Sequence, residues 1–112
     1  MTASNDDLVF AGTARLAELV RDRQVSPREL VQLYVQRIAQ LDPILNAFRV
    51  VLTDQAMQEA VRVEHRLAAG EELPLAGVPI AVKDDTDVAG VSSMCGTGID
   101  AGPASADCAA VR

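Results

Sequence analysis

Apolar residues recur at helical spacing over residues 13–70, and this part of the chain is predicted to form a helical arm. Leu16, Leu19 and Val20 share one face of a first, short helix. Another helix is predicted with Thr53 as its N-cap, and Gly70 is a fitting C-terminal stop for it. The positions at helical spacing in that helix are Met57, Ala60, Val61, Glu64, Leu67 and Ala68.

The helix predicted between these two carries a strong start signal. Ser26 is a favoured N-cap, Pro27 suits the first helical position, and Glu29 stands where a capping-box acid belongs. Val25 and Leu30 are placed to form a hydrophobic staple over this start. The stripe that follows consists of Leu30, Tyr34, Ile38 and Leu41, widened by Val31 and Val35. Asp42-Pro43 is predicted to end the helix, because a residue before proline resists the helical conformation.

Two stretches lack the helical period. Residues 46–52 are short and rich in β-branched side chains, so they are predicted to form a strand or an extended connector. After a loop at residues 73–77, residues 78–83 are predicted to form a strand that is apolar on both faces, as in a covered sheet. Pro79 lies near the start of this strand, where a missing N–H is tolerated.

The last part of the chain is predicted to be irregular before it turns helical again. Glycines at positions 90, 96, 98 and 102 favour a tight loop. Ser105 is placed as an N-cap, and Asp107 would complement the dipole of the first turn. Because the chain stops at Arg112, soon after this helix start, the sequence is expected to be truncated.

Size and charge narrow the class of protein. A chain of 112 residues is one domain at most, or a piece of one, and its apolar fraction of 49% is that of a globular protein. The net charge of −6 argues against binding to nucleic acid or to an anionic membrane. No apolar run approaches the roughly 20 residues of a membrane span, and the acidic N-terminus lacks signal-peptide features. We therefore expect a cytoplasmic protein.

The cysteines and the histidine are not expected to form a metal site. Cys95 and Cys108 do not have Cys-x-x-Cys spacing, and His65 is far from both in sequence. In a cytoplasmic protein the two cysteines are expected to be reduced thiols. His65 lies on a predicted helix beside Glu64 and Arg66, where we expect a solvated surface side chain and not a catalytic base.

Lys83 is the candidate catalytic residue, and two interpretations of it compete. In the structural one it marks a strand end, and its ammonium reaches water or pairs with Asp84, Asp85 or Asp87. In the functional one it lies at the carboxyl end of a central strand, where α/β sheets place their chemistry. Desolvation would then favour the neutral amine, which can act as a general base. The three nearby acids act in the opposite direction, because negative charge favours the ammonium.

Several motifs together resemble the amidase-signature family of amide hydrolases. The residues that match its lysine segment are Leu75-Ala-Gly-Val-Pro-Ile-Ala-Val-Lys-Asp84, followed by Asp87-Val-Ala-Gly90. Val25-Ser-Pro-Arg-Glu-Leu30, Arg37-Ile38, Leu41-Asp-Pro43 and Leu45-Asn-Ala-Phe48 resemble its N-terminal arm, and Ser92-Ser-Met-Cys-Gly-Thr97 and Gly102-Pro-Ala-Ser-Ala-Asp107 resemble the loop and turn that follow. The resemblance covers the chain from about Thr13 onwards.

The resemblance implies a Ser–cis-Ser–Lys catalytic unit, with Lys83 matching the lysine that acts as base through the middle serine. Both serines and the oxyanion-binding backbone lie downstream in the family, and Ser92, Ser93 and Ser105 do not stand in a Gly-Gly-Ser-Ser-Gly context. The sequence also departs from the family pattern at three positions. Asp85 replaces the usual asparagine, Ser92 a frequent proline, and Thr97 a frequent serine.

Residues 1–112 are therefore expected to be the N-terminal part of one amidase-signature domain, with the helical arm at about 13–70 and the start of a mixed-sheet α/β core at about 71–112. The implied activity is hydrolysis of a small carboxylic acid amide to carboxylate and ammonia, with no metal or organic cofactor and no direct nucleic-acid or membrane partner. The chain alone is expected to be inactive, and a homo-oligomer is left open. The alternatives are the amidase subunit of a tRNA-dependent amidotransferase and a non-catalytic helical interaction module.

Overall fold

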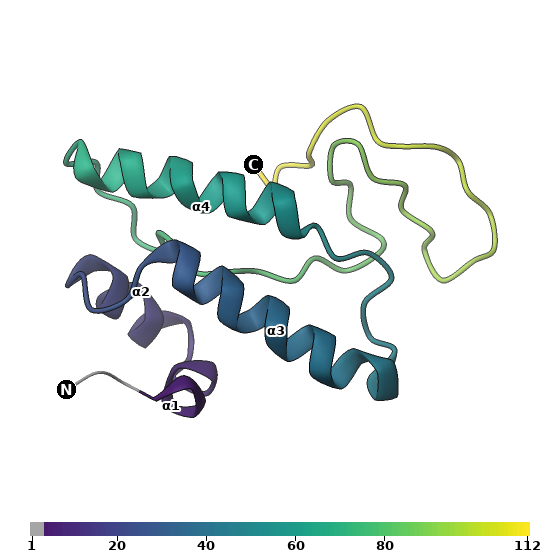
Figure 1. Cartoon of the computed structure of the whole chain (residues 1–112). Helices are drawn as coiled ribbons and strands as arrows, with labels where there is room; N and C mark the ends of the chain where they lie inside the picture. The colour runs from purple at the N-terminus through teal and green to yellow at the C-terminus, as the bar shows by residue number, and fades with distance from the viewer. Residues whose placement is uncertain (1–3) are drawn as a thin grey trace. The chain divides into compact units, whose positions relative to one another are not determined.

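The computed structural model describes residues 4–112, and within that range the chain forms four helices. They are α1 (Asn5–Val9), α2 (Thr13–Arg21), α3 (Pro27–Leu45) and α4 (Thr53–Ala68), as Figure 1 shows. The chain divides into two compact units, a helical unit that ends at Pro79 and a loop unit that spans Ile80–Arg112. In the helical unit, α3 and α4 lie side by side. None of the helices within residues 4–112 is long and apolar enough to cross a membrane.

The predicted start of α3 is confirmed. Ser26 is the N-cap, and Pro27 lies in the first turn. The Ser26 hydroxyl accepts the Glu29 N–H at 3.2 Å, and the Glu29 carboxylate accepts the Ser26 N–H at 2.7 Å. The bond from the Ser26 backbone is the largest cause of a lowered pKa at Glu29, followed by the bond with its side chain. Because the folded-state pKa is depressed, this stabilisation is present above the ordinary glutamate pKa and is lost as the pH falls through the lowered value.

Replacing Ser26 with alanine should lower the free energy of unfolding of the helical unit by about 1 kcal/mol, because α3 would lose its N-cap acceptor. A urea titration followed by far-ultraviolet circular dichroism measures this loss. Ser105→Ala is a matched control, since no helix begins at Ser105 in the structure. That variant should stay within about 0.5 kcal/mol of the parent. Equal losses in the two variants would contradict the capping role of Ser26.

The core of the helical unit lies where α2 meets the start of α3. The three apolar positions predicted to share a face of α2 are all buried, which confirms that face. Val25 and Leu30, the predicted staple pair, are buried in the same cluster. The whole buried cluster consists of Leu16, Leu19, Val20, Val25 and Leu30, and the half-buried residues Leu8, Ala11, Tyr34, Leu67 and Val78 pack against it. On the outside of the unit, Arg28 Nε lies 3.0 Å from the Glu64 carboxylate and so joins α3 to α4.

A glycine lets the chain after α4 pack closely on this core. Gly77 has a φ of +78°, and a Cβ there would lie 2.8 Å from Pro27 Cγ and 3.2 Å from Val20 Cγ1. Only a residue without a side chain fits both this backbone conformation and this close approach. The segment as far as Pro79 therefore belongs to the helical unit, although the sequence pattern already changes at about residue 70.

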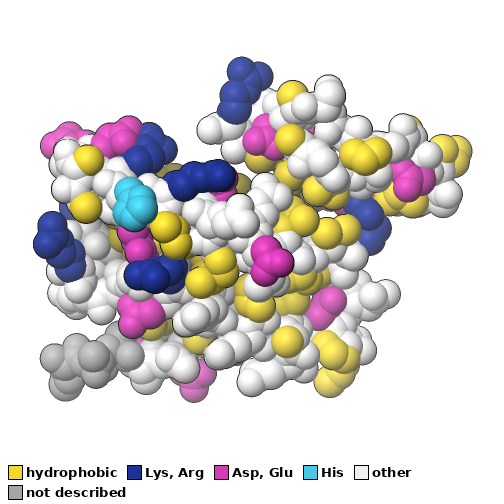
Figure 2. All heavy atoms as spheres, turned by 45° about the horizontal axis from the view of Figure 1, so that its top comes forward, with side chains coloured by type: hydrophobic (Ala, Val, Ile, Leu, Met, Phe, Trp, Pro, Cys, Tyr) yellow, Lys and Arg dark blue, Asp and Glu magenta, His cyan; other side chains and the backbone are white. Residues whose placement is uncertain are grey.

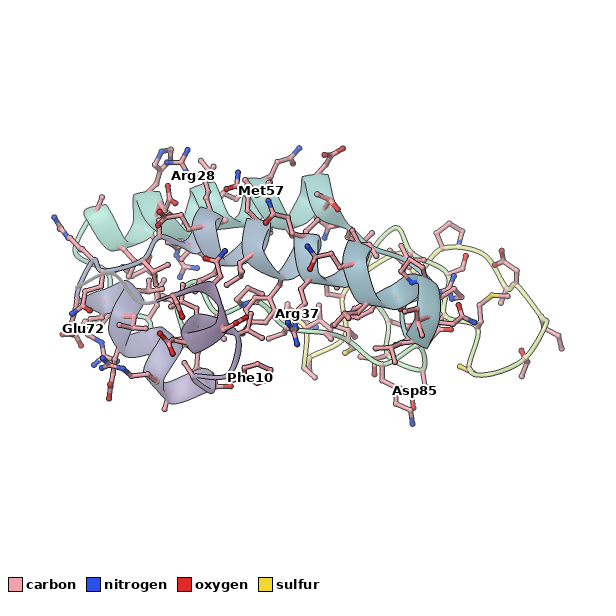
Figure 3. The ribbon with its side chains drawn as sticks, turned by 60° about the horizontal axis from the view of Figure 1, so that its bottom comes forward. Phe10, Arg28, Arg37, Met57, Glu72 and Asp85 are labelled. Atoms are coloured by element: carbon pink, nitrogen blue, oxygen red, sulfur yellow. The ribbon has the colours of Figure 1, made fainter. Side chains whose placement is uncertain are left out.

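Helix α1 lies in the acidic N-terminal stretch, where the sequence analysis predicts no helix. The Ser4 hydroxyl accepts the Asp7 N–H at 3.2 Å, and Asp7 Oδ2 accepts the Ser4 N–H at 3.1 Å. These two bonds form a capping box, with aspartate in the place where glutamate or glutamine is usual. After α1, the Phe10 ring faces the Arg37 guanidinium of α3 at 5.2 Å, a cation–π contact that Figure 3 displays.

The predicted end of α3 at Asp42-Pro43 is wrong, because the helix runs to Leu45 with Pro43 inside it. Proline removes one helical hydrogen bond, but the Asn46 N–H still donates to the Asp42 carbonyl at 2.7 Å. Asp42 Oδ1 also accepts the N–H groups of Ala47 and Phe48, at 2.7 and 3.0 Å. These three bonds to one aspartate hold the last turn, and Asn46 ends the helix in the left-handed conformation.

The strand predicted at residues 78–83 is not formed, and residues 4–112 contain no strand. A strand requires a neighbour for its hydrogen bonds, and none of the described segments pairs with residues 78–83. The apolar side chains of this segment, which were predicted to lie inside a covered sheet, are therefore not covered by one, and Ile80 is 73% exposed. Residues 46–52 form a connector between α3 and α4 without strand pairing, which is the second of the two predicted alternatives. Only the helical part of the predicted α/β class is therefore observed.

The helix predicted from Ser105 is also absent, and residues 105–112 form bends and turns. So short a segment has few helical hydrogen bonds to offset the cost of nucleation. Asp107, predicted to complement a helix dipole, instead accepts a backbone N–H from another part of the loop unit.

Candidate functional site

Lys83 belongs to the loop unit and is the only lysine in the sequence. Its side chain is 82% exposed, and its Nζ lies 3.1 Å from Asp85 Oδ2. The other oxygen of the same carboxylate, Oδ1, accepts the Thr86 hydroxyl at 3.0 Å. The bond from Lys83 is the largest cause that lowers the pKa of Asp85, and the bond from Thr86 is the next. The structure thus pairs Lys83 with one of the three acids that the sequence offered.

The segment that follows Lys83 is folded by backbone hydrogen bonds. The Thr86 N–H donates to the Lys83 carbonyl at 3.1 Å and closes a turn. The Asp84 carbonyl accepts the Cys95 N–H at 2.9 Å, and Asp84 Oδ1 accepts the Met94 N–H at 3.3 Å. The backbone of Asp84 is therefore fixed to the loop that was predicted to follow it, and this fixes the position from which the lysine side chain extends.

The glycine-rich loop is tied on its other side by residues from near the C-terminus. Asp107 Oδ1 accepts the Ala89 N–H at 2.7 Å. Ala89 and Ala104 form an isolated parallel bridge, in which the Gly90 N–H donates to the Ala104 carbonyl at 2.9 Å. The Cys108 N–H donates to the Asp87 carbonyl at 3.0 Å. Sequence reasoning missed these ties, because no local pattern connects residues 18 positions apart.

The other side chains considered in the sequence analysis are a serine, the histidine and the two cysteines. The Ser93 hydroxyl donates to the Thr86 carbonyl at 3.3 Å. His65 is exposed on α4, as predicted, and Figure 2 shows it on the molecular surface. Cys95 and Cys108 are free thiols, also as predicted. Within residues 4–112, no group of three or more histidine, cysteine or acidic side chains is placed to hold a metal ion.

The described contacts place the ammonium of Lys83 beside the Asp85 carboxylate. None of these contacts brings a second catalytic group to Lys83. A lysine on an anchored turn can serve as a base once it is enclosed, because enclosure favours the neutral amine. Acyl transfer also needs a nucleophile and donors for the oxyanion. Asp85, with its side chain on the outside of the ribbon in Figure 3, remains a charged partner of this lysine.

Comparisons with known sequences point to one family. Residues 29–112 match the family model described as Amidase. The putative amidase AmiB2 of Mycobacterium tuberculosis is 45% identical over 106 residues, which are 95% of this chain and 23% of that protein. One subunit of the glutamyl-tRNA(Gln) amidotransferase of Acidothermus cellulolyticus is 43% identical over 94 residues, which are 83% of this chain and 19% of that protein. The chain thus spans about a fifth of the length of these relatives.

Solved structures agree with the sequence relatives. A bacterial aryl acylamidase of the amidase-signature enzyme family superposes with a TM-score of 0.72 at 39% identity, covering 76% of this chain and 18% of that one. A structure described as a vestigial protein complex that reveals the evolutionary origins of an s-triazine catabolic enzyme superposes with a TM-score of 0.80 at 35% identity. That match covers 85% of this chain and 21% of the other.

Proposed function

The chain belongs to the amidase family, and we propose that it is the N-terminal part of an enzyme that hydrolyses a carboxylic acid amide to a carboxylate and ammonia. The observation that carries the proposal is the family match over residues 29–112, which includes Lys83 and the loop that follows it. In this proposal the complete enzyme also contains segments like those that its relatives have beyond the matched region, since the chain spans about a fifth of their length. Cytoplasmic location is part of the proposal.

In the proposed mechanism Lys83 is the general base. A downstream serine attacks the amide carbon, and its proton passes through the middle serine to the neutral amine of Lys83. The tetrahedral intermediate then releases the nitrogen of the substrate amide. This nitrogen takes the proton back from Lys83 through the middle serine and leaves as ammonia. Water then attacks the acyl-enzyme and gives a proton to Lys83 through the middle serine. Return of that proton to the nucleophilic serine frees the serine and the carboxylate. No metal or organic cofactor takes part in these steps.

The mixed sheet predicted for this family belongs to the complete enzyme in our proposal. Residues 78–83 would pair there with strands that lie outside this chain. Their apolar side chains support this, because Ile80 and Val82 are exposed here and would be buried in a covered sheet. Pairing would also enclose Lys83, which is the last residue of this segment.

A second candidate function is the amidase subunit of a tRNA-dependent amidotransferase. The similarity to one subunit of glutamyl-tRNA(Gln) amidotransferase favours it. Such a protein would take ammonia from glutamine and would need partner subunits. Assays of the complete enzyme separate the two candidates. A stand-alone amidase should release ammonia from a simple amide without added subunits, whereas an amidotransferase subunit should release it from glutamine and only when its partner subunits are present.

The sequence of the gene beyond Arg112 tests the proposal directly. We expect an open reading frame that continues into a Gly-Gly-Ser-Ser-Gly segment, because the base needs the two downstream serines. A stop codon directly after Arg112 would contradict the enzymatic proposal. It would favour the remaining alternative, a non-catalytic helical module in which Lys83 and its neighbours serve only packing.

A further inference from the structure

A groove in the helical unit lies where three helix ends meet. The C-terminal ends of α2 and α4 and the start of α3 surround a hollow of about 450 Å³, and Figure 1 shows these three elements. The floor of the groove is apolar and consists of Val20, Val25, Pro27 and Leu67. Val20 and Val25 are core residues, so the floor is part of the packed interior of the unit. The lining residues all belong to the helical unit and none to the loop unit.

The rim of the groove carries acids and bases that differ in how they are engaged. Each of the three lining carboxylates is held by a neighbour, Glu29 by the Ser26 N–H, Glu64 by Arg28 and Glu71 by Arg66. Arg21 and Arg23 also line the groove and are exposed, and within residues 4–112 neither has an ion pair. The charged groups that the rim leaves without a partner are therefore two guanidinium groups.

The backbone at Arg23 points independently to a use for its side chain. Helices α2 and α4 end with the same bonds, because the Arg23 N–H donates to the Val20 carbonyl and the Gly70 N–H donates to the Leu67 carbonyl, both at 3.0 Å. Arg23 and Gly70 both have a positive φ, of +58° and +85°, and both line the groove. Glycine is the residue that this position favours, so an arginine there has a conformational cost that glycine would avoid. A strained residue at the rim of a groove is typical of a functional contact.

We propose that this groove binds an acidic segment of a partner protein, with carboxylates on Arg21 and Arg23 and one apolar side chain on the floor. Guanidinium groups match the geometry of carboxylates and bind them through two parallel hydrogen bonds. Charge complementarity selects this occupant, because a basic segment would meet two cations without partners and a neutral one would leave them unpaired. The apolar floor lies beside both arginines and gives the segment an anchor.

Binding can be measured in the 112-residue chain with the blocked peptide acetyl-Glu-Leu-Glu-amide, followed by nuclear magnetic resonance of the backbone amides. We expect a dissociation constant below about 1 mM, with shifts at Arg23 and Val25 and weaker binding as salt is added. Blocked Gln-Leu-Gln lacks the charges and blocked Glu-Gly-Glu lacks the apolar side chain, so each should bind more weakly. Absence of binding at about 1 mM peptide, or equal binding of Gln-Leu-Gln, would overturn the proposal.

Arg23→Gly separates binding from folding. Glycine relieves the left-handed conformation, so the urea midpoint should equal or exceed that of the parent chain. Affinity for the Glu-Leu-Glu peptide should fall about fivefold, the size expected from an exposed charge pair. Arg15→Ala is the matched control, because it removes a cation of α2 that pairs with Glu18 at 3.1 Å and does not line the groove. Undiminished affinity in Arg23→Gly, or an equal loss in Arg15→Ala, would contradict the role of the groove.

Other occupants of the groove would be visible in related measurements. A concentration-dependent dimer of the chain that Arg23→Gly abolishes would assign the groove to a second copy, and the partner assignment would fail. The partner assignment would also fail if the complete enzyme did not bind the peptide that the 112-residue chain binds, because the groove would then be covered by the enzyme itself. Lys83 belongs to the loop unit, so Lys83→Arg should leave peptide affinity unchanged whether or not Lys83 is the base.

Discussion

Lys83→Ala should lower the turnover of the complete enzyme by about a thousandfold or more, because the members of a catalytic unit fail together when one is removed. Without the amine, the proton of the nucleophilic serine has no acceptor, and the serine stays a weak nucleophile. Substrate binding should change much less than turnover, since the lysine is proposed to move a proton and not to hold the amide. Steady-state kinetics with a simple amide measures both quantities.

Arg28→Ala is the matched control for this substitution. Arg28 is also a cation paired with a carboxylate, that of Glu64 at 3.0 Å, but it lies on α3 in the helical unit. Losing such an exposed pair should cost about 1 kcal/mol of stability or less and leave turnover unchanged. A similar fall in turnover in both variants would show that loss of fold, and not loss of the base, explains the effect of Lys83→Ala.

The 112-residue chain alone should hydrolyse no amide. It contains the proposed base, but the proposed nucleophile, the relay serine and the oxyanion donors lie in downstream segments of the family. Electrostatic stabilisation of the oxyanion is usually the largest single contribution to acyl transfer, so a base without it gives little acceleration. Release of a coloured aniline from a simple anilide by the purified chain is a sensitive assay. Turnover that Lys83→Ala abolishes would contradict the account.

Local signals in the sequence were sufficient to predict α2, the start of α3 and the presence of α4. The cap predicted for α4 is wrong, because Thr53 is its first helical residue and Leu52 is the N-cap, without a side-chain hydrogen bond. The capping box of Ser26 and Glu29 and the buried face of α2 depend on residues within one or two turns of each other, and both are confirmed. The same kind of signal, Ser4 with Asp7, was present before α1 and was missed. Pro43 misled the prediction because three bonds to the Asp42 backbone and carboxylate hold the turn that proline weakens.

The parts that could not be predicted depend on distant partners. A strand at residues 78–83 needs a neighbouring strand, which residues 4–112 do not supply. The bond between Asp107 and Ala89 joins positions that no periodic pattern relates. At the candidate site, the motif singled out Lys83, but the sequence could not decide which of three nearby acids would pair with it. In the structure Lys83 pairs with Asp85, whose other carboxylate oxygen accepts the Thr86 hydroxyl.

The central claim is that Lys83 acts as a base, and Lys83→Arg tests it most directly. Arginine keeps the positive charge and can keep the contact with Asp85, but its guanidinium stays protonated far above neutral pH and cannot accept the proton of a serine. The measurement is turnover and thermal stability of the complete enzyme, with Lys83→Arg and the parent side by side. The account predicts a loss of turnover as severe as that of Lys83→Ala at nearly unchanged stability. Near-normal turnover in Lys83→Arg would contradict it and would make Lys83 a structural cation at the end of an apolar segment.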